Sequence, residues 1–358
     1  MRISDYYSLL RENKFQIHPA RYPMTVMVSG CAAINSLLGA TQQAIYGRKI
    51  SSAELERPPV FVIGHWRSGT TLMHELLSLD ERLSFPSNFD AFVPHHFLLS
   101  RYFLYPVVKL LIPTRRPMDN MSLGIASPQE DDFALCSWGA PTPYRRIAFP
   151  NRPNRDHLLL DIANAQPQQL DDLKSAMQKF INSLTVRYHS QLVLKSPPHT
   201  GRIAKLAKWF PGAKFIHLSR HPYKLVPSTM RLWQTLDQLQ AFQIPRYDDA
   251  CLKNYIFECQ QLMYSAYLQQ RSEIPDNQLV EVKFEQLVKQ PVDELSRIYQ
   301  QLEMGEFDKL QPGIERYFQQ KKDHKTNTLE LDETLRTEID AHWRGYMENF
   351  GYESEPAS

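Results

Sequence analysis

The pattern of apolar and polar positions divides much of this chain into two kinds of segment, which follow one another in turn. Short apolar runs rich in β-branched residues recur at residues 60–64, 191–194 and 213–218, and residues 279–287 follow a similar pattern. Such runs are typical of buried parallel strands. Each run is followed by a segment whose apolar residues have helical spacing. The pattern therefore predicts an α/β fold, a parallel sheet in a three-layer arrangement.

The N-terminal region has a different pattern. Residues 1–57 predict helices, which we expect to form an extension ahead of a main domain at 58–358. Residues 23–40 carry no charge, but Ser29, Asn35 and Ser36 interrupt them, and the stretch falls short of the ~20 apolar residues of a membrane span. We expect a docking helix or an interfacial one, so peripheral membrane contact through 23–40 is left open. No cleavable secretory signal precedes it, which favours a cytoplasmic location.

The middle of the chain, residues 84–157, is rich in Pro, Phe and Tyr and has little clean periodicity. A long insertion of this kind often carries function, and we expect it to form the lid of a pocket. Its aromatic content favours an apolar ligand.

Composition excludes several classes of protein. The 358 residues include 41 Lys and Arg against 39 Asp and Glu, so the net charge of +2 gives no bulk field for a nucleic acid. The four cysteines are far apart and form no CxxC pair, which argues against a disulfide scaffold or a structural zinc site. We expect buried free thiols in a reducing compartment.

The first chemical signal is the segment GHWRSGTTL, which links the strand at 60–64 to a helix. Gly64, Gly69 and Thr71 have the spacing of a phosphate-binding P-loop, but Thr70 stands where that loop has its lysine. Backbone N–H groups at the start of the helix would still converge on an anion. Arg67 adds a permanent charge inside the loop. The loop therefore predicts a phosphate-bearing donor other than a magnesium nucleoside triphosphate.

Two further loops leave the carboxyl ends of predicted strands, where ligands of such sheets bind. In LSRHPYKLVPSTM, Arg220 follows a strand directly and Ser228 lies eight residues on, so the pair can hold a second phosphate. In LVLKSPPHT, Lys195 ends a strand and His199 follows a proline pair. Taken alone, Arg220 and Lys195 would more often be ordinary surface charges, and His199 an ordinary residue at the start of a helix.

Together these three loops resemble the PAPS-dependent sulfotransferase superfamily, in which PAPS is 3′-phosphoadenylyl sulfate. The resemblance is greatest to the bacterial "sulfotransferase family protein" group, which also shows segments like PMDNMSLGIASPQEDDFAL and LVLKSPPHTGRI. It is more distant to tyrosylprotein sulfotransferases around LVLKSPP and FPGAKFIHLSR. The likeness runs from about residue 58 to 352. It implies the sulfotransferase variant of the fold of P-loop-containing nucleoside triphosphate hydrolases.

The resemblance also implies roles for single residues around the 5′ end of PAPS. The backbone amides of four loop residues, together with the threonine hydroxyls, would hold the 5′-phosphate: Ser68, Gly69, Thr70 and Thr71. Arg67 stands where cytosolic sulfotransferases often have a lysine, and would stabilise the charge that develops on departing adenosine 3′,5′-bisphosphate (PAP). Lys195 matches the catalytic lysine of the tyrosylprotein relatives and would clamp the sulfuryl oxygens.

At the other end of the donor, Arg220 and Ser228 would bind the 3′-phosphate, and Lys325 would add a late basic contact. One departure from the family pattern is Phe284, which stands where a tyrosine usually contacts adenine. Stacking would survive this change, but a hydroxyl contact would not. No metal is needed if Arg67 and Lys195 supply the positive charge.

A base must also accept the proton of the acceptor hydroxyl. Our order of preference is Glu130, in the acidic segment SPQEDDF, then His199, then Asp90. An acidic pair such as Glu130 and Asp131 more often caps a helix or is solvated.

Two other functions fit parts of the sequence. The Gly64 and Gly69 spacing also suits a P-loop nucleotide kinase or NTPase, against which Thr70 is the discriminating feature. A non-catalytic binding protein is the third alternative. The three loops retain the residues that a catalytic site would need, which argues against it: Arg67, Lys195, Arg220 and Ser228. The acceptor stays open among small-molecule and lipid hydroxyls, sugars and peptide tyrosine.

Overall fold

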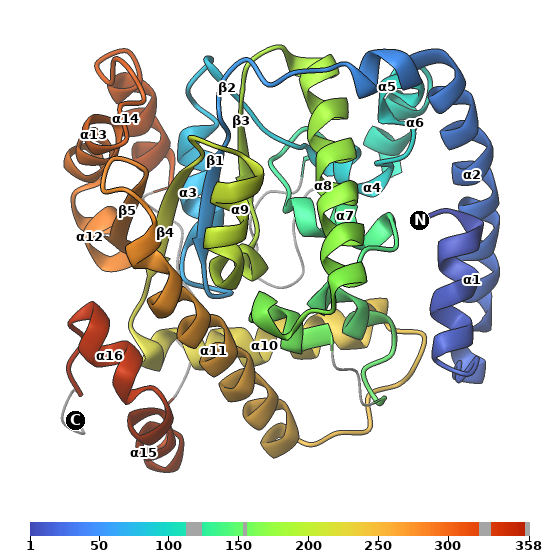
Figure 1. Cartoon of the computed structure of the whole chain (residues 1–358). Coiled ribbons are helices and arrows are strands. Elements are labelled where there is room, and N and C mark those ends of the chain that lie inside the picture. Colours follow the sequence, from blue (N-terminus) through green and yellow to red (C-terminus); the bar gives the residue numbers. More distant parts are fainter. Residues whose placement is uncertain (112–123, 153–155, 322–330, 355–358) are drawn as a thin grey trace. The chain divides into compact units, whose positions relative to one another are not determined.

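The computed structural model describes residues 1–111, 124–152, 156–321 and 331–354 (Figure 1). Its contacts divide the chain into two compact units. The first comprises Met1–Pro59, Arg82–Leu194 and Gln234–Tyr247, and the second comprises Val60–Glu81, Lys195–Trp233 and Asp248–Ser358.

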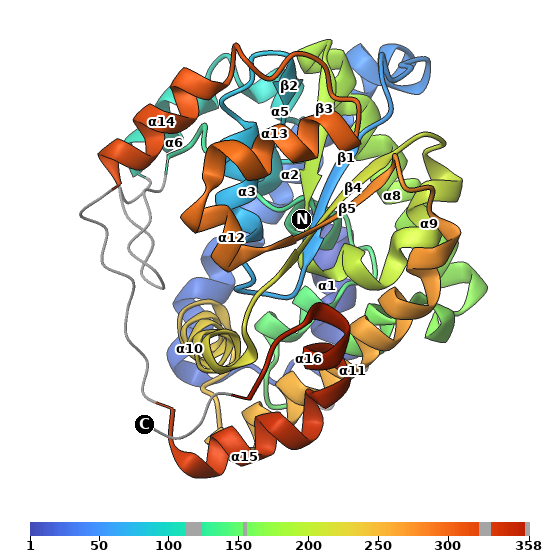
Figure 2. The same cartoon turned by 90° about the vertical axis from the view of Figure 1, so that its left-hand side faces the viewer.

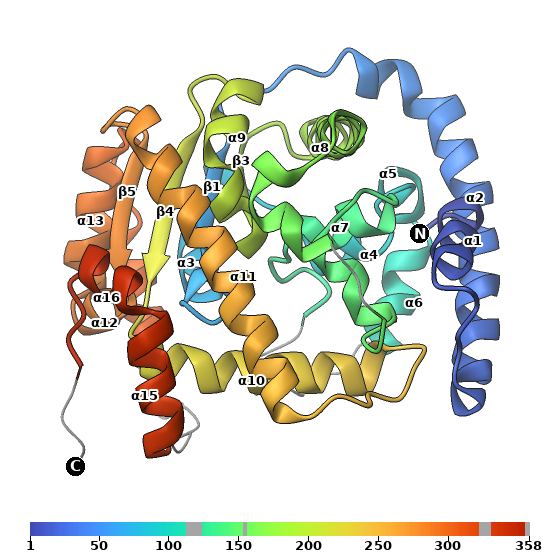
Figure 3. The same cartoon turned by 60° about the horizontal axis from the view of Figure 1, so that its bottom comes forward.

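The second unit is built on three neighbouring parallel strands, β1 (Val60–Gly64), β4 (Lys214–Ser219) and β5 (Leu279–Lys283) (Figure 3). β1 lies in register with β4, Val60 opposite Lys214, and β4 continues the ladder to β5. All five residues of β1 are buried, as its uninterrupted apolar run requires. The carboxyl ends of the three strands therefore lie at one edge.

Helices surround these strands in the same unit, and the 3₁₀ helix η5 packs against both β1 and α11. Their bounds are α3 (Thr70–Leu77), η5 (Pro197–Arg202), α9 (Ile203–Trp209), α11 (Asp249–Gln270), η6 (Arg271–Glu273), α12 (Phe284–Lys289), α13 (Pro291–Gln301), α14 (Gln311–Gln320), α15 (Glu333–His342) and α16 (Arg344–Phe350). Helix α10 (Pro222–Gln240) begins in this unit and ends in the first. Figure 2 shows α12 and α13 following β5 along the chain.

The first unit is mainly helical, and its short strand β2 (Leu83–Ser84) pairs in parallel with β3 (Gln191–Lys195). Its helices are α1 (Ile3–Glu12), η1 (Pro19–Arg21), α2 (Tyr22–Ser51), α4 (Asn88–Phe92), α5 (Phe97–Ser100), α6 (Leu104–Leu111), α7 (Asp131–Ser137), η2 (Pro143–Ala148), η3 (Asp156–Leu160), η4 (Ile162–Asn164) and α8 (Pro167–Tyr188). The described part of the middle section thus consists mostly of short helices. A lid function for it stays a prediction.

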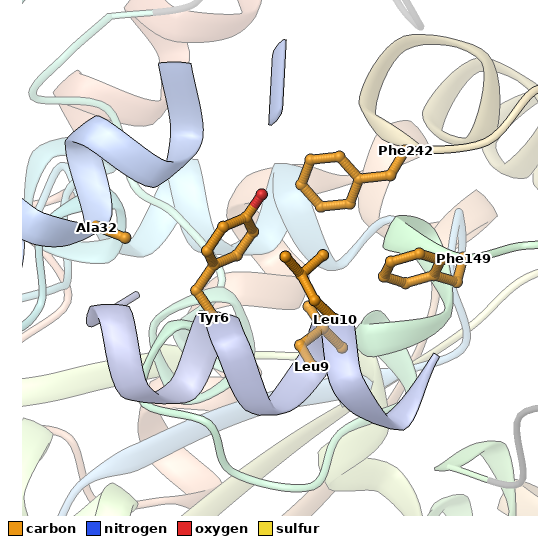
Figure 4. Packing of buried hydrophobic residues seen from close by; sticks show 6 residues of the cluster. All are labelled: Tyr6, Leu9, Leu10, Ala32, Phe149 and Phe242. Atoms are coloured by element: carbon orange, nitrogen blue, oxygen red, sulfur yellow. The ribbon is translucent and has the colours of Figure 1, made fainter. Parts of the chain in front are cut away.

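A cluster of buried side chains holds α1 against its surroundings in this unit (Figure 4). Tyr6 and Leu10 of α1 point toward Phe149 and Phe242, and the Tyr6 and Phe242 ring centroids are 5.8 Å apart. Ala32 brings α2 into the same cluster. Helix α1 is therefore a packed element of the unit, because its apolar face is buried.

The predicted parallel α/β class and the helical N-terminal region are confirmed. Two details of the strand predictions were wrong. The strand predicted at 279–287 ends at Lys283, where α12 begins, and the two-residue β2 was not predicted. A division into an extension at 1–57 and a domain at 58–358 stays a prediction.

The expectation of buried thiols was also wrong for most of the cysteines. All four are free, but Cys31 and Cys251 are exposed, Cys136 is half-buried, and Cys259 alone of the four is buried. The reason is local: Cys31 lies on the outer side of α2, and Cys251 lies in the first turn of α11.

Candidate active site

The loop between β1 and α3 has the backbone of an anion-binding turn. Gly64 and Gly69 adopt φ angles of 137° and 105°, which only glycine takes up without strain. A Cβ on Gly64 would lie 2.7 Å from the Ser68 Oγ and closer still to the Leu218 carbonyl of β4. Gly69 is the N-cap of α3, so the N–H groups that follow it have no acceptor within the helix. These N–H groups, with the helix dipole behind them, can bind an anion.

Ser68 is fully buried at the base of this loop. Its N–H donates to the His65 carbonyl at 3.1 Å, so this amide is already engaged within the loop. Its hydroxyl has no hydrogen-bond partner. A buried polar atom without a partner is costly, and a ligand oxygen would satisfy it. The hydroxyl of Ser68, rather than its amide, is therefore the group with unused hydrogen-bonding capacity.

Arg67 stands at the centre of the site. Its φ of 69° is in the left-handed region, which costs a non-glycine residue about 1–2 kcal/mol. Its Nε donates to the Ser228 Oγ of α10 at 2.9 Å, and its carbonyl accepts a hydrogen bond from the Arg220 Nη1 at 3.0 Å. The loop after β1 and the segment after β4 are thus joined directly, although they were predicted as two separate phosphate sites.

Arg220 also lies over the ring of Phe284, with its guanidinium carbon 4.4 Å from the ring centroid. The same ring reaches the loop, because a Cβ on Gly69 would be 2.9 Å from Phe284 Cε2 and closer to Cδ2. Burial, followed by the charge of nearby Arg67, lowers the pKa of Arg220 below its ordinary value. Two cations held this close favour a ligand with at least two negative charges.

The C-terminal part of the chain supports Arg220 from behind. The Tyr346 hydroxyl of α16 accepts from the Arg220 N–H at 3.0 Å and donates to the Arg220 carbonyl at 3.1 Å. Tyr352 donates to Glu285 at 3.0 Å, and Glu285 accepts from the His221 N–H at 3.0 Å. These supporting hydrogen bonds were not predicted from the sequence, since no local pattern marks a tyrosine that bonds to backbone so far away along the chain.

The segment from Lys195 to Thr200 belongs to the same unit as the loop. Thr200 accepts the Gly64 N–H on its Oγ1 at 2.7 Å, so η5 is bonded to the first residue of the loop. Lys195 is only 2% exposed, and the buried Ser196 hydroxyl beside it has no hydrogen-bond partner. His199 is fully buried, with its ring edge-on to Phe61 at 5.5 Å. Lys195 is therefore a buried strand-end cation and not a solvated one.

The acidic candidates lie in the first unit. Glu130 is the residue before α7, is half-buried and accepts a hydrogen bond from the Tyr144 hydroxyl. Asp131 begins α7 and is buried, so this pair does stand at a helix start. Their role in proton transfer stays a prediction.

Asp90 has a structural role instead. It forms a capping box with Ser87 at the start of α4, an ion pair with Arg187 and a hydrogen bond from the Tyr188 hydroxyl at 2.8 Å. These partners occupy a carboxylate that is fully buried. Asp90 is thus a poor choice of base.

The remaining predicted residues have mixed outcomes. Thr70 and Thr71 lie in the first turn of α3, where their N–H groups have no acceptor within the helix. Lys325 lies outside the described residues. No group of three or more His, Cys, Asp or Glu that could hold a metal is found within the described ranges.

The comparisons with known proteins agree on one family. A family model described as "Sulfotransferase family" matches residues 58–309. The chain is 36% identical over 360 residues to "Omega-hydroxy-beta-dihydromenaquinone-9 sulfotransferase Stf3" of Mycobacterium bovis and of Mycobacterium tuberculosis, a match that covers 99% of this chain and 91% of each relative.

Solved structures show a similar fold. Sulfotransferase STF9 from Mycobacterium avium matches with a TM-score of 0.66 and 20% identity, over 88% of this chain and 82% of that one. Sulfotransferase STF1 from Mycobacterium tuberculosis H37Rv matches with a TM-score of 0.62 and 15% identity, over 96% of this chain and 91% of that one.

Proposed function

The chain belongs to the sulfotransferase family, and from this premise we propose that it transfers the sulfuryl group of PAPS to the hydroxyl of a lipid-like acceptor. The products would be PAP and a sulfate ester. The observation that carries the donor proposal is the contact of Arg67 with both Ser228 and Arg220 around a P-loop that lacks its lysine.

The donor would be held at two points. The N–H groups at the start of α3 and the Ser68 hydroxyl would bind the 5′-phosphate, while Arg220 and Ser228 would bind the 3′-phosphate. In the structure Ser228 already bonds to Arg67, so a bound phosphate would share or replace that hydrogen bond. Phe284 would offer its remaining surface to the adenine, because its other side stacks on Arg220.

The reaction needs little beyond positioning and neutralisation of charge. A bond forms between the acceptor oxygen and sulfur, and the bond from sulfur to the 5′-phosphate oxygen breaks on the opposite side. Arg67 would stabilise the charge left on PAP, and Lys195 the charge spread over the sulfuryl oxygens. The acceptor proton would pass to a base, for which we favour the half-buried Glu130 over the fully buried His199.

The acceptor proposal comes from the mycobacterial relatives. Their name describes an apolar molecule that carries a hydroxyl at its omega position, and a match over 99% of this chain makes such an acceptor the first one to test. We likewise propose a cytoplasmic location with association to the membrane. The helix at Pro19–Ser51 is the basis for the membrane association, because it is apolar and long enough to cross a membrane by length and composition.

The test is incubation of the purified protein with radiolabelled PAPS and an omega-hydroxylated menaquinone. We expect label in the quinone, with none in the same quinone that lacks the hydroxyl. Lys195→Ala should lower the transfer rate by about 10²–10³ while PAP affinity changes little, because the lysine would act on the sulfuryl oxygens. Preference for ATP with magnesium over PAP in calorimetry would contradict the proposal and favour an NTPase.

A further inference from the structure

The polarity of α2 is inverted relative to a water-facing helix. Its exposed face is apolar along most of its length, with Val26 71% exposed, Ile34 59% and Leu37 70%. Met27 and Ile45 share this face and are also exposed. Residues at such spacing fall on one side of a helix, and a surface helix normally turns that side inward.

The opposite face of α2 carries several polar side chains that turn toward the protein. Three of them accept hydrogen bonds from other elements of the first unit: Asn35 from His96 Nε2 at 2.9 Å, Ser36 from the Ile3 N–H at 2.9 Å, and Gln42 from the Leu99 N–H at 3.1 Å. Figure 1 shows α1 alongside α2, as these contacts require. The polar face is therefore committed to the fold, and the apolar face is left without a partner among the described residues.

The charges around this helix indicate what would cover the apolar face. Residues 13–53 contain four Lys and Arg and no Asp or Glu. Lys14 precedes the helix, and Arg48 and Lys49 stand exposed in its last turn. Such a segment has no carboxylate with which to pair the basic residues of a second copy, whereas anionic lipid headgroups would pair with them.

We propose that α2 is a lipid-docking helix that lies in the plane of an anionic bilayer, with Val26, Ile34 and Leu37 inserted at the boundary of headgroups and acyl chains. Its 30 residues give a length of about 45 Å, enough to cross a membrane. Crossing would expose the inward polar face to hydrocarbon and break its hydrogen bonds, so the helix lies along the surface. The proposal does not depend on PAPS. A helix docked in this way would hold the active site next to a bilayer, where it could reach the hydroxyl of an acceptor that stays in the membrane.

Flotation with vesicles of phosphatidylcholine and phosphatidylglycerol tests it. The full chain should float, and the combined variant Val26→Ser, Ile34→Ser and Leu37→Ser should partition at least about a hundredfold less. The matched control makes the same changes at three exposed apolar positions elsewhere and should float like the unaltered chain: Leu239→Ser, Ile244→Ser and Val288→Ser. Replacing Arg48 and Lys49 by Gln should weaken binding about fivefold for each charge.

The exposed Cys31 of α2 gives a second readout. An environment-sensitive dye on Cys31, in a Cys251→Ser background, should brighten on addition of vesicles. The same dye on Cys251, in a Cys31→Ser background, should not.

Three outcomes would overturn the proposal. The first is that the unaltered chain does not float with the vesicles. The second is that the Val26, Ile34 and Leu37 variant floats as well as the control variant. The third is that the chain is a dimer, that this variant is a monomer, and that neither binds vesicles. The last outcome would assign the face to a second copy. Calorimetry of PAP binding and circular dichroism of each variant verify that it folds. Helix α2 holds no proposed donor-binding group. If the unaltered chain floats with vesicles but does not bind PAP, the donor proposal is contradicted and the lipid-docking proposal is not.

Discussion

Gly69→Ala is the sharpest single perturbation of the donor site. The new Cβ would lie 2.9 Å from Phe284 Cε2 and closer to Cδ2, and the backbone would have to hold φ near 105° with a side chain present. The backbone strain alone costs about 1–3 kcal/mol. Movement of Phe284 would also disturb its stacking on Arg220, which is worth about 0.5–2 kcal/mol. We therefore expect the free energy of unfolding to fall by about 2–4 kcal/mol.

Two measurements follow from this estimate. Thermal unfolding should shift down by at least about 4 °C, given about 2–4 °C per kcal/mol for domains of 150–250 residues. PAP affinity, measured by calorimetry, should fall at least about tenfold, because Arg220 loses the ring that positions it. Gly345→Ala in α16 is the matched control, since a Cβ there meets nothing within 4 Å. It should leave stability unchanged or raise it by about 0.5–1 kcal/mol.

A double-mutant cycle with Phe284→Ala separates strain from steric contact. Once the ring is absent, Gly69→Ala should destabilise the fold only through backbone strain. The effects of the two substitutions on the free energy of unfolding should therefore differ from additivity by about 1–2 kcal/mol. A coupling energy near zero would refute a steric clash between residue 69 and Phe284. Equal stability of Gly69→Ala and Gly345→Ala would refute the backbone strain as well.

Three further predictions concern the charges and histidines. Arg220→Met should weaken PAP binding by about 10²–10³, and Ser228→Ala by no more than about tenfold, since only the arginine supplies charge; equal losses in calorimetry would refute this. Lys195→Met should lower the rate of sulfuryl transfer and keep the melting shift caused by PAP, and loss of that shift would make the lysine a donor-binding residue. Burial lowers the pKa of His65 and of His217 to about 4. Each stays neutral in the fold while the unfolded chain binds a proton below about pH 6.5, so stability is complete above that pH and falls, by at most about 3 kcal/mol for each, toward pH 4. Urea unfolding should show a shallower acid loss for His217→Phe, whose ring would keep the stacking between two aromatic neighbours.

The sequence was sufficient to predict, to within one residue, where β1 and β4 end and which loops follow them. Each chemical segment is local: GHWRSGTTL contains its strand end, glycines and helix start within nine residues, so its backbone could be inferred without the fold. The same holds for Arg220, which directly follows β4. Parallel strands then bring such ends to one edge of a sheet.

Contacts between distant parts of the chain could not be predicted in this way. Arg67 and Ser228 are 161 residues apart, and their hydrogen bond depends on where β1 and α10 come together. Asp90 was a candidate base from the sequence, since its ion pair with Arg187 forms only in the folded unit. The strand at 279–283 was extended too far because Phe284 continues the alternation of Val280 and Val282, although it begins a helix.

Tyr346 and Tyr352 would give the C-terminal segment an influence on the proposed reaction, although neither is a proposed ligand of the donor. The Tyr346 hydroxyl forms hydrogen bonds with the backbone N–H and the carbonyl of Arg220. The Tyr352 hydroxyl forms hydrogen bonds with the side chains of Ser219 and Glu285. Proteolytic cleavage just before α16 would leave every proposed phosphate-binding residue in the chain, but Arg220 would lose its hydrogen bonds to Tyr346. The clipped enzyme should then need more sulfate donor for the same turnover, an effect that inspection of the reacting groups alone would never suggest.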